Sequence, residues 1–168
     1  MSTLQEFRLD KDNFVKNDHQ SPLAPEQRRS FAGLNYYAED PALRFELPLD
    51  KAALPQPVIL STSTGEAREY MLIGQVHFEV DGQPASLQVY NDDYGYFLPF
   101  VDATAPDETY GAGRYLEPHE LADGLLLVDF NLAYNPYCAY NERWSCPLPP
   151  RENRLKVRIA AGEKKYHD

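Results

Sequence analysis

The chain has 168 residues and a formal net charge of −10, and its length suits a single domain. Hydrophobic residues make up 43% and charged residues 25%, as in globular rather than disordered or fibrous proteins. Acidic side chains outnumber basic ones by 26 to 16, which argues against the basic surface that nucleic-acid binding requires. No run of 18 uncharged apolar residues occurs, so we expect no contact with membranes.

The first 40 residues predict a helical segment. Thr3, with Glu6 three residues later, has the pattern of a capping box at the start of a helix over residues 3–17. Pro25 is typical of the first turn of a second, short helix that ends near Phe31. Residues 1–14 carry no basic region followed by an apolar one, so we expect a cytoplasmic protein.

From residue 41 onward, alternating apolar residues and frequent Pro and Gly predict strands. The expected strands are 42–49, 57–62, 71–80, 83–90, 95–101, 124–132 and 154–161. Asp81 and Gly82 favour a tight hairpin turn. In the last strand, apolar residues alternate with Arg154, Lys156 and Arg158, which is typical of a half-buried antiparallel strand.

Together these elements predict a mainly β fold, an antiparallel β-barrel or sandwich with a short N-terminal helical segment packed on it. We expect residues 1–168 to form one domain, with a helical N-terminal segment at 1–40 and a β domain at 41–168.

A small set of polar residues stands out in the second half of the chain. Asp129 and Asn131 share one face of the strand over 124–132, together with leucines. A carboxylate on such a face needs a partner, because burying it unpaired is costly. Arg114 is the natural partner of Asp129, and Asp102 competes for the same pairing. The pair is either a ligand anchor at a barrel mouth or an internal salt bridge that stabilises the fold.

An irregular segment follows, rich in Pro and aromatic residues. Its aromatic side chains could cover an open end of the barrel; they are Tyr134, Tyr137, Tyr140 and Trp144. Cys138 and Cys146 lie eight residues apart in this region. Buried free thiols are the favoured interpretation, and a zinc site, a disulfide and a catalytic cysteine stay open as alternatives. We expect no metal.

Several long strings resemble one known family. TYGAGRYL, DFNLAYNPYCAYN, SCPLPPRENRL and AGEK, preceded in order by SPL, FAGLNYY and PFVDAT, look like the signature of the domain-of-unknown-function family numbered 1684. The resemblance covers nearly the whole chain. It implies a predominantly β fold and no particular activity, substrate or cofactor.

Three hypotheses about function follow. The first is binding of a small polar ligand at a barrel mouth lined by acidic, basic, amide and aromatic side chains. The candidate residues are Asp102, Tyr110, Arg114, Tyr115, Asp129, Asn131, Tyr134 and Asn135. The second is a hydrolase with Asp129 as general base and Arg114 or Tyr115 stabilising charge. The third is a protein-interaction role for the basic face of residues 154–158. The sequence names no cofactor and no oligomeric state.

Overall fold

The computed structural model describes residues 2–167, except for the side chains of residues 52–54. Helix α1 (Thr3–Asn17) begins after Ser2, whose hydroxyl accepts the backbone N–H of Gln5. The side chain of Gln5 in turn accepts the N–H of Ser2. The capping box therefore starts one residue earlier than predicted, because Ser2 is the residue with extended backbone and Thr3 is already helical.

The N-terminal segment packs on the β structure through its own small apolar cluster. Helix α2 (Pro25–Ser30) begins at a proline, as expected. The cluster consists of Val15, Leu23, Phe31, Leu34 and Tyr140. Because Tyr140 belongs to the aromatic segment far along the chain, this cluster joins the helices to the rest of the molecule. Within residues 2–167, no helix is long and apolar enough to cross a membrane.

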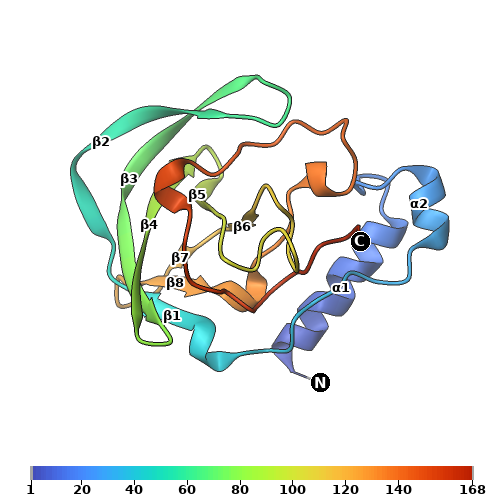
Figure 1. Ribbon diagram of the computed structural model, residues 1–168, viewed down its shortest axis with the longest axis horizontal. Helices are drawn as coiled ribbons and strands as arrows, with labels where there is room; N and C mark the ends of the chain where they lie inside the picture. The colour runs from blue at the N-terminus through green and yellow to red at the C-terminus, as the bar shows by residue number, and fades with distance from the viewer. Residues whose placement is uncertain (1, 168) are drawn as a thin grey trace.

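The strands form two antiparallel sheets rather than a closed barrel (Figure 1). The larger sheet has the order β2-β3-β4-β5-β6. Its strands are β2 (Asp50–Ser61), β3 (Ala67–Val80), β4 (Gln83–Asp92), β5 (Gly95–Phe100) and β6 (Arg114–Leu116). The smaller sheet has the order β1-β8-β7, with β1 (Arg44–Leu47), β8 (Leu126–Asp129) and β7 (His119–Glu120). The fold is mainly β and consistent with a sandwich.

The hairpin of β3 and β4 confirms the clearest sequence prediction. Asp81 and Gly82 both have positive φ, 53° and 78°, as a two-residue hairpin turn requires. At Gly74 in β3 the register with β4 shifts. A Cβ atom at Gly74 would lie 2.4 Å from the carbonyl oxygen of Asp50, so only glycine allows β2 and β3 to approach this closely.

Aromatic rings join the two sheets in the main core. The ring centroid of Phe78 in β3 lies 5.1 Å from that of Phe45 in β1 and 5.5 Å from that of Phe130. Phe130 follows β8 and also meets Phe100 of β5 edge-on, at 5.3 Å. Contacts of this kind exclude water between the sheets and stabilise their packing.

Residues 154–161 differ from the predicted antiparallel strand. The alternation is confirmed, because Val157 and Ile159 are buried while the three basic side chains are exposed. However, the segment makes only an isolated parallel bridge, between Arg154 and Val101. The carbonyl groups of Ile159 and Ala161 bond instead to the Arg114 side chain. At Ile159 and Ala161 the Arg114 guanidinium thus supplies the hydrogen-bond donors that the predicted neighbouring strand would have supplied.

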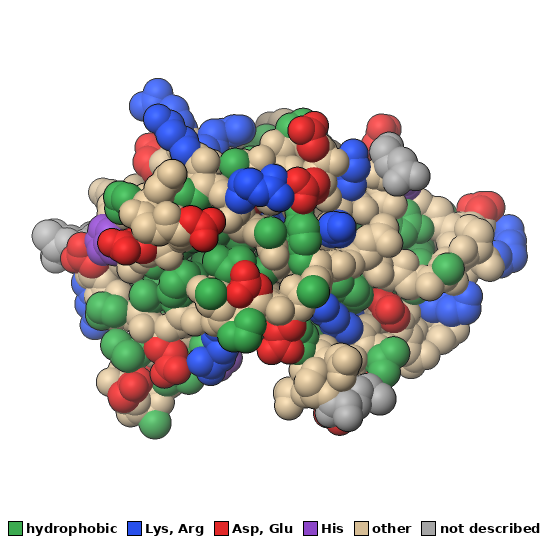
Figure 2. Space-filling view, turned by 60° about the horizontal axis from the view of Figure 1, so that its bottom comes forward, with side chains coloured by type: hydrophobic (Ala, Val, Ile, Leu, Met, Phe, Trp, Pro, Cys, Tyr) green, Lys and Arg blue, Asp and Glu red, His purple; other side chains and the backbone are tan. Residues whose placement is uncertain are grey.

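Three other boundaries changed. The expected strand over 42–49 begins with a single 3₁₀ turn, η1 (Pro41–Leu43), because a proline is tolerated in the first turn of a helix. The expected strand over 124–132 ends at Asp129, whose side chain caps the 3₁₀ turn η2 (Phe130–Leu132). Strand β6 lies outside the predicted strands. On the face in Figure 2, acidic and basic side chains are mixed without a continuous basic patch.

Candidate functional site

Arg114 pairs with Asp102 and not with Asp129. Its Nη2 donates to Asp102 at 3.2 Å and to the carbonyl of Ile159 at 2.9 Å. Its Nη1 donates to the carbonyls of Ala161 and Glu163. Both charged side chains are 1% exposed. The prediction of an Arg114–Asp129 pair is therefore wrong, and the competing Asp102 pairing forms as an internal salt bridge.

Asp102 and Arg114 bind the final segment of the chain to the body. The second carboxylate oxygen of Asp102 accepts the backbone N–H of Ile159 at 2.6 Å and the hydroxyl of Thr104 at 2.8 Å. Burial lowers the pKa of Arg114, and the charge of Asp102 opposes that effect. The donors and acceptors described above all bond to other groups of the protein. The pair therefore stabilises the fold.

Asp129 and Asn131 form a separate local network. The carboxylate of Asp129 accepts the backbone N–H and the side-chain amide of Asn131. Asn131 also exchanges two hydrogen bonds with the backbone of Asp40, at 2.8 and 2.9 Å. This network joins the end of β8 to the entry of β1. The hydrolase arrangement, with Arg114 beside Asp129, is not assembled.

A large cavity lies between α1, the five-stranded sheet and the aromatic segment. Its volume is about 710 Å³, which lies within the range typical of small-molecule sites. Helix α1 contributes Phe7, Lys11, Phe14 and Val15 to its wall. The sheet contributes Tyr70, Phe97 and Tyr115, and the aromatic segment contributes residues from Tyr134 to Pro147.

Aromatic rings make up much of this wall, and several of their hydroxyl groups bond to protein. Tyr115 donates to the carbonyl of Pro147, Tyr134 to Glu117 and Tyr140 to Glu163. Burial is the main cause that raises the pKa of Tyr115, Tyr134 and Tyr140 above the usual value. These phenols are therefore neutral at physiological pH, and the rings remain available for contacts within the cavity.

Glu163 connects α1 to the body beside the cavity. Its buried carboxylate accepts hydrogen bonds from Lys11 of α1, from the hydroxyl of Tyr140 and from the backbone N–H of Asn135. The ammonium group of Lys11 also lies 4.8 Å from the ring centroid of Tyr134. The one basic group that α1 contributes to the cavity wall is thus already paired.

Asn135 leaves one polar atom without a partner. Its side-chain NH₂ donates to the carbonyl of Lys164 at 3.0 Å. Its Oδ1 is buried and has no hydrogen-bond partner in the described part of the chain. Asn135 lines the cavity. A buried acceptor without a donor is costly, and this oxygen is itself buried rather than exposed to the cavity.

The structure brings together only part of the predicted set. Tyr115, Tyr134 and Asn135 line the large cavity. Asp129 lines a separate, smaller pocket that it shares with Tyr134. Tyr110 contacts Cys138 instead, and Asp102, Arg114 and Asn131 are buried in the structural networks. Helix α1 was not predicted to form a wall of the cavity, because its position depends on packing against distant segments of the chain.

The two cysteines are free and buried, as the favoured interpretation expected. Within residues 2–167, no cluster of three or more His, Cys, Asp or Glu side chains could hold a metal ion. Of the basic face, Arg158 is bound to Glu108 at 2.7 and 3.1 Å, while Arg154 and Lys156 are exposed.

Comparisons with known proteins place the chain among relatives of unknown function. The sequence model of a family described as "Protein of unknown function (DUF1684)" matches residues 29–164. The structure is similar to the solution NMR structure of an uncharacterised protein of Haloarcula marismortui, with 39% sequence identity and a TM-score of 0.72. That match covers 96% of this chain and 91% of the other. A search of curated proteins found no significant match.

Proposed function

The chain belongs to the DUF1684 family, and we propose that it binds a small molecule with an apolar, ring-bearing body in the cavity between α1 and the five-stranded sheet. The observation that carries this proposal is the cavity itself, about 710 Å³ in volume and walled by aromatic rings from three parts of the chain. Sites for small molecules are typically concave and mostly apolar, with few polar groups that orient the ligand.

The polar groups of the wall restrict the chemistry of the ligand. Asn135 lines the wall, but its oxygen without a donor is itself buried, so we expect the ligand to bind mainly through ring contacts. The hydroxyls of Tyr115 and Tyr134 are bonded to protein, so those residues contribute their rings. Stacking or edge-on contacts with a flat ligand are the expected interactions.

A fluorescence titration tests this proposal directly. Trp144 lines the cavity and is the single tryptophan of the chain, so its emission reports on the site. The probe is 8-anilino-1-naphthalenesulfonate, which has fused rings and an N–H donor. We expect probe emission to rise and Trp144 emission to fall with the same saturable dependence on concentration, at one probe per chain. A panel of phenols, indoles and nucleosides should then displace the probe.

Two variants on α1 provide a matched control. Phe7 and Leu9 are both exposed apolar residues, at 44% and 55%, but only Phe7 lines the cavity. Phe7→Ala should weaken probe binding about fivefold, the loss expected for one aromatic contact of about 1 kcal/mol. Leu9→Ala should leave binding unchanged. Equal effects of the two variants, or no saturable binding by any compound, would contradict the proposal.

A further inference from the structure

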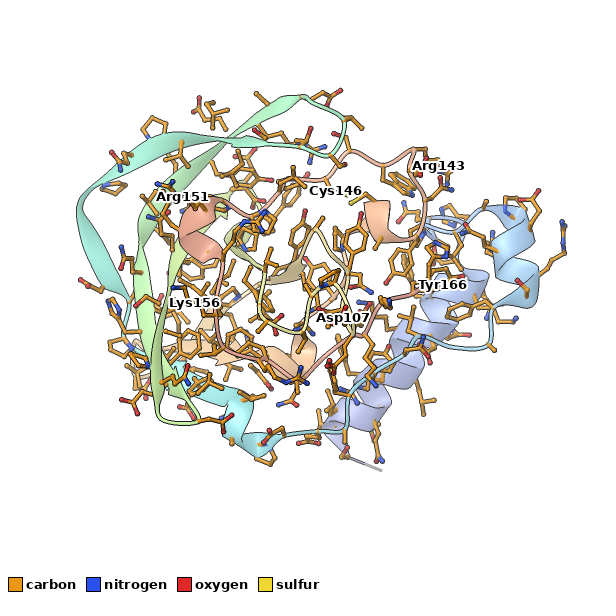
Figure 3. The ribbon with its side chains drawn as sticks, viewed as in Figure 1. Asp107, Arg143, Cys146, Arg151, Lys156 and Tyr166 are labelled. Carbon is orange, nitrogen blue, oxygen red and sulfur yellow. The ribbon has the colours of Figure 1, made fainter. Side chains whose placement is uncertain are left out.

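Cys138 and Cys146 meet at the edge of the cavity. Cys138 lies in the 3₁₀ turn η3 (Tyr137–Ala139), and Cys146 lies in the irregular segment that follows (Figure 3). Both belong to the apolar cluster around Tyr115, and they are 9% and 7% exposed. Cys146 also forms part of the cavity wall, which gives small solutes a route to the pair.

Backbone hydrogen bonds hold Cys146 beside Cys138. The N–H of Cys138 donates to the Sγ of Cys146 at 3.3 Å. The backbone of Cys146 is fixed in turn by two hydrogen bonds with Ser63, at 2.9 and 3.1 Å. On the other side, the hydroxyl of Tyr110 donates to the Sγ of Cys138 at 3.6 Å. Each sulfur therefore accepts one hydrogen bond, from Tyr110 at Cys138 and from a backbone N–H at Cys146, and the two residues lie side by side.

The two thiols differ in acidity, because the pKa of Cys138 is lowered and that of Cys146 is raised. A hydrogen bond from the Cys146 thiol, followed by that from Tyr110, lowers the pKa of Cys138 to about 6. The hydrogen bond to Cys138, together with burial, raises the pKa of Cys146. A thiolate beside a protonated thiol has the arrangement of an attacking and a resolving cysteine.

We propose that Cys138 and Cys146 are a thiol redox site, which small hydroperoxides oxidise to an intramolecular disulfide. In the first step the Cys138 thiolate attacks one peroxide oxygen, so that an S–O bond forms and the O–O bond breaks. The leaving alkoxide or hydroxide takes up a proton, and Cys138 becomes a sulfenic acid. The Cys146 sulfur then attacks the Cys138 sulfur, and the S–O bond breaks with release of water. Two thiols lose two electrons, and the peroxide is reduced to an alcohol and water, or to two waters.

The site does not depend on the proposed ligand, because its reactants are the two sulfur atoms and the peroxide. It does border the same cavity, so oxidation would change one wall of it. The chain contains two cysteines in total, and each product is therefore assigned without ambiguity by mass.

The experiment treats the reduced, full-length protein with one equivalent of hydrogen peroxide or tert-butyl hydroperoxide. Intact mass should fall by the two hydrogens lost in a disulfide, a digest should contain a 138–146 cross-link, and dithiothreitol should reverse both changes. Cys146→Ser should stop the reaction at the sulfenic acid of Cys138, which dimedone traps. Cys138→Ser should leave Cys146 as a thiol over the same time.

Two tyrosine variants distinguish a specific redox site from cysteines that are oxidised only because solvent reaches them. Tyr110→Phe removes the hydroxyl that donates to Cys138 and should slow oxidation several-fold. Tyr94→Phe alters a ring that is 98% exposed and lies outside the cavity wall, and it should not change the rate. Cross-links between chains, retention of both thiols, or equal rates in the folded and urea-unfolded protein would overturn the proposal.

Discussion

At Arg114 a single guanidinium group donates to three backbone carbonyls and to one carboxylate. The carbonyls belong to Ile159, Ala161 and Glu163, in the final segment that lies outside the two sheets. The charge is acceptable in the interior because Asp102 lies opposite to it. This residue therefore stabilises the final segment of the chain, and it does so from the short strand β6.

Removing Arg114 should destabilise the fold strongly. Arg114→Met leaves the buried carboxylate of Asp102 without its cation, and we expect the free energy of unfolding to fall by about 3–5 kcal/mol. Urea denaturation provides the measurement. Asp102→Asn in the same chain removes the unpaired charge, so the double variant should be more stable than the sum of the single effects predicts. Simple additivity would show that the two side chains do not interact.

Gly113 is a second residue whose type is restricted by its surroundings. Its φ is +99°, and a Cβ atom there would lie 2.5 Å from the carbonyl oxygen of Phe100 and 2.9 Å from Pro149. Gly113 therefore combines a positive φ with a close approach to β5 and to the proline segment.

Two glycine-to-alanine variants separate the cost of a positive φ from the cost of steric overlap with the backbone. Gly124 also has positive φ, +86°, but has open space around it. Gly124→Ala should cost about 1–2 kcal/mol for the backbone conformation alone. Gly113→Ala should cost about 1–3 kcal/mol more, because the added methyl overlaps backbone. Thermal or urea unfolding of the two variants measures the difference, and equal losses would contradict the steric explanation.

Helix α1 is the element that completes the cavity. It packs on the molecule through Val15 and the small cluster around Tyr140, and through the ion pair of Lys11 with Glu163. The family match begins at residue 29, so this helix lies outside the matched segment. Its attachment depends on few contacts compared with the strands, and local opening is expected where buried contacts are few.

Lys11→Met should loosen α1 selectively. The buried carboxylate of Glu163 would lose its only ion pair among the described residues, and leaving it uncompensated is costly. We expect faster amide hydrogen exchange in α1, with little change in β3 and β4. Adding Glu163→Gln removes the unpaired charge and should restore slow exchange in part. Uniform acceleration across the sheet would show that the ion pair supports the whole fold instead.

Over the whole molecule, buried tyrosines link the apolar clusters and the cavity. Desolvation is the main cause that raises the pKa of Tyr90 to about 12 and that of Tyr115 and Tyr134 further. A group whose pKa is higher in the folded state contributes stability below its unfolded pKa, near 10, and loses it as pH rises. These tyrosines therefore make the fold sensitive to alkali.

Unfolding free energy should fall steeply between about pH 10 and 12, since the unfolded chain releases protons there first. Absorbance at 295 nm should show phenolate appearing together with unfolding. Tyr115→Phe should reduce the proton release on unfolding by about one. Tyr94→Phe alters a ring that is 98% exposed and should leave the pH slope unchanged. A slope unaffected by Tyr115→Phe would contradict this account.

Local features of the fold were predictable from the sequence. The helix over residues 3–17, the hairpin at Asp81 and Gly82, and the alternation of Val157 and Ile159 with basic residues all follow from periodicity and turn chemistry. These signals depend on neighbours within a few positions. The aromatic segment from Tyr134 to Trp144 was predicted to cover an open end of a barrel, and the structure places it instead in the wall of the cavity.

The tertiary structure alone decided which distant groups meet. Nothing in the sequence pattern distinguishes Asp102 from Asp129 as the partner of Arg114, because both are carboxylates that a fold could bring to it. The position of α1 beside Tyr115 and Phe97 likewise depends on packing between segments far apart in the chain. The sequence by itself determined an acidic, mainly β protein with two helices at its start. The partners of its buried charges, the two open sheets and the cavity follow from three-dimensional packing, which no local pattern encodes.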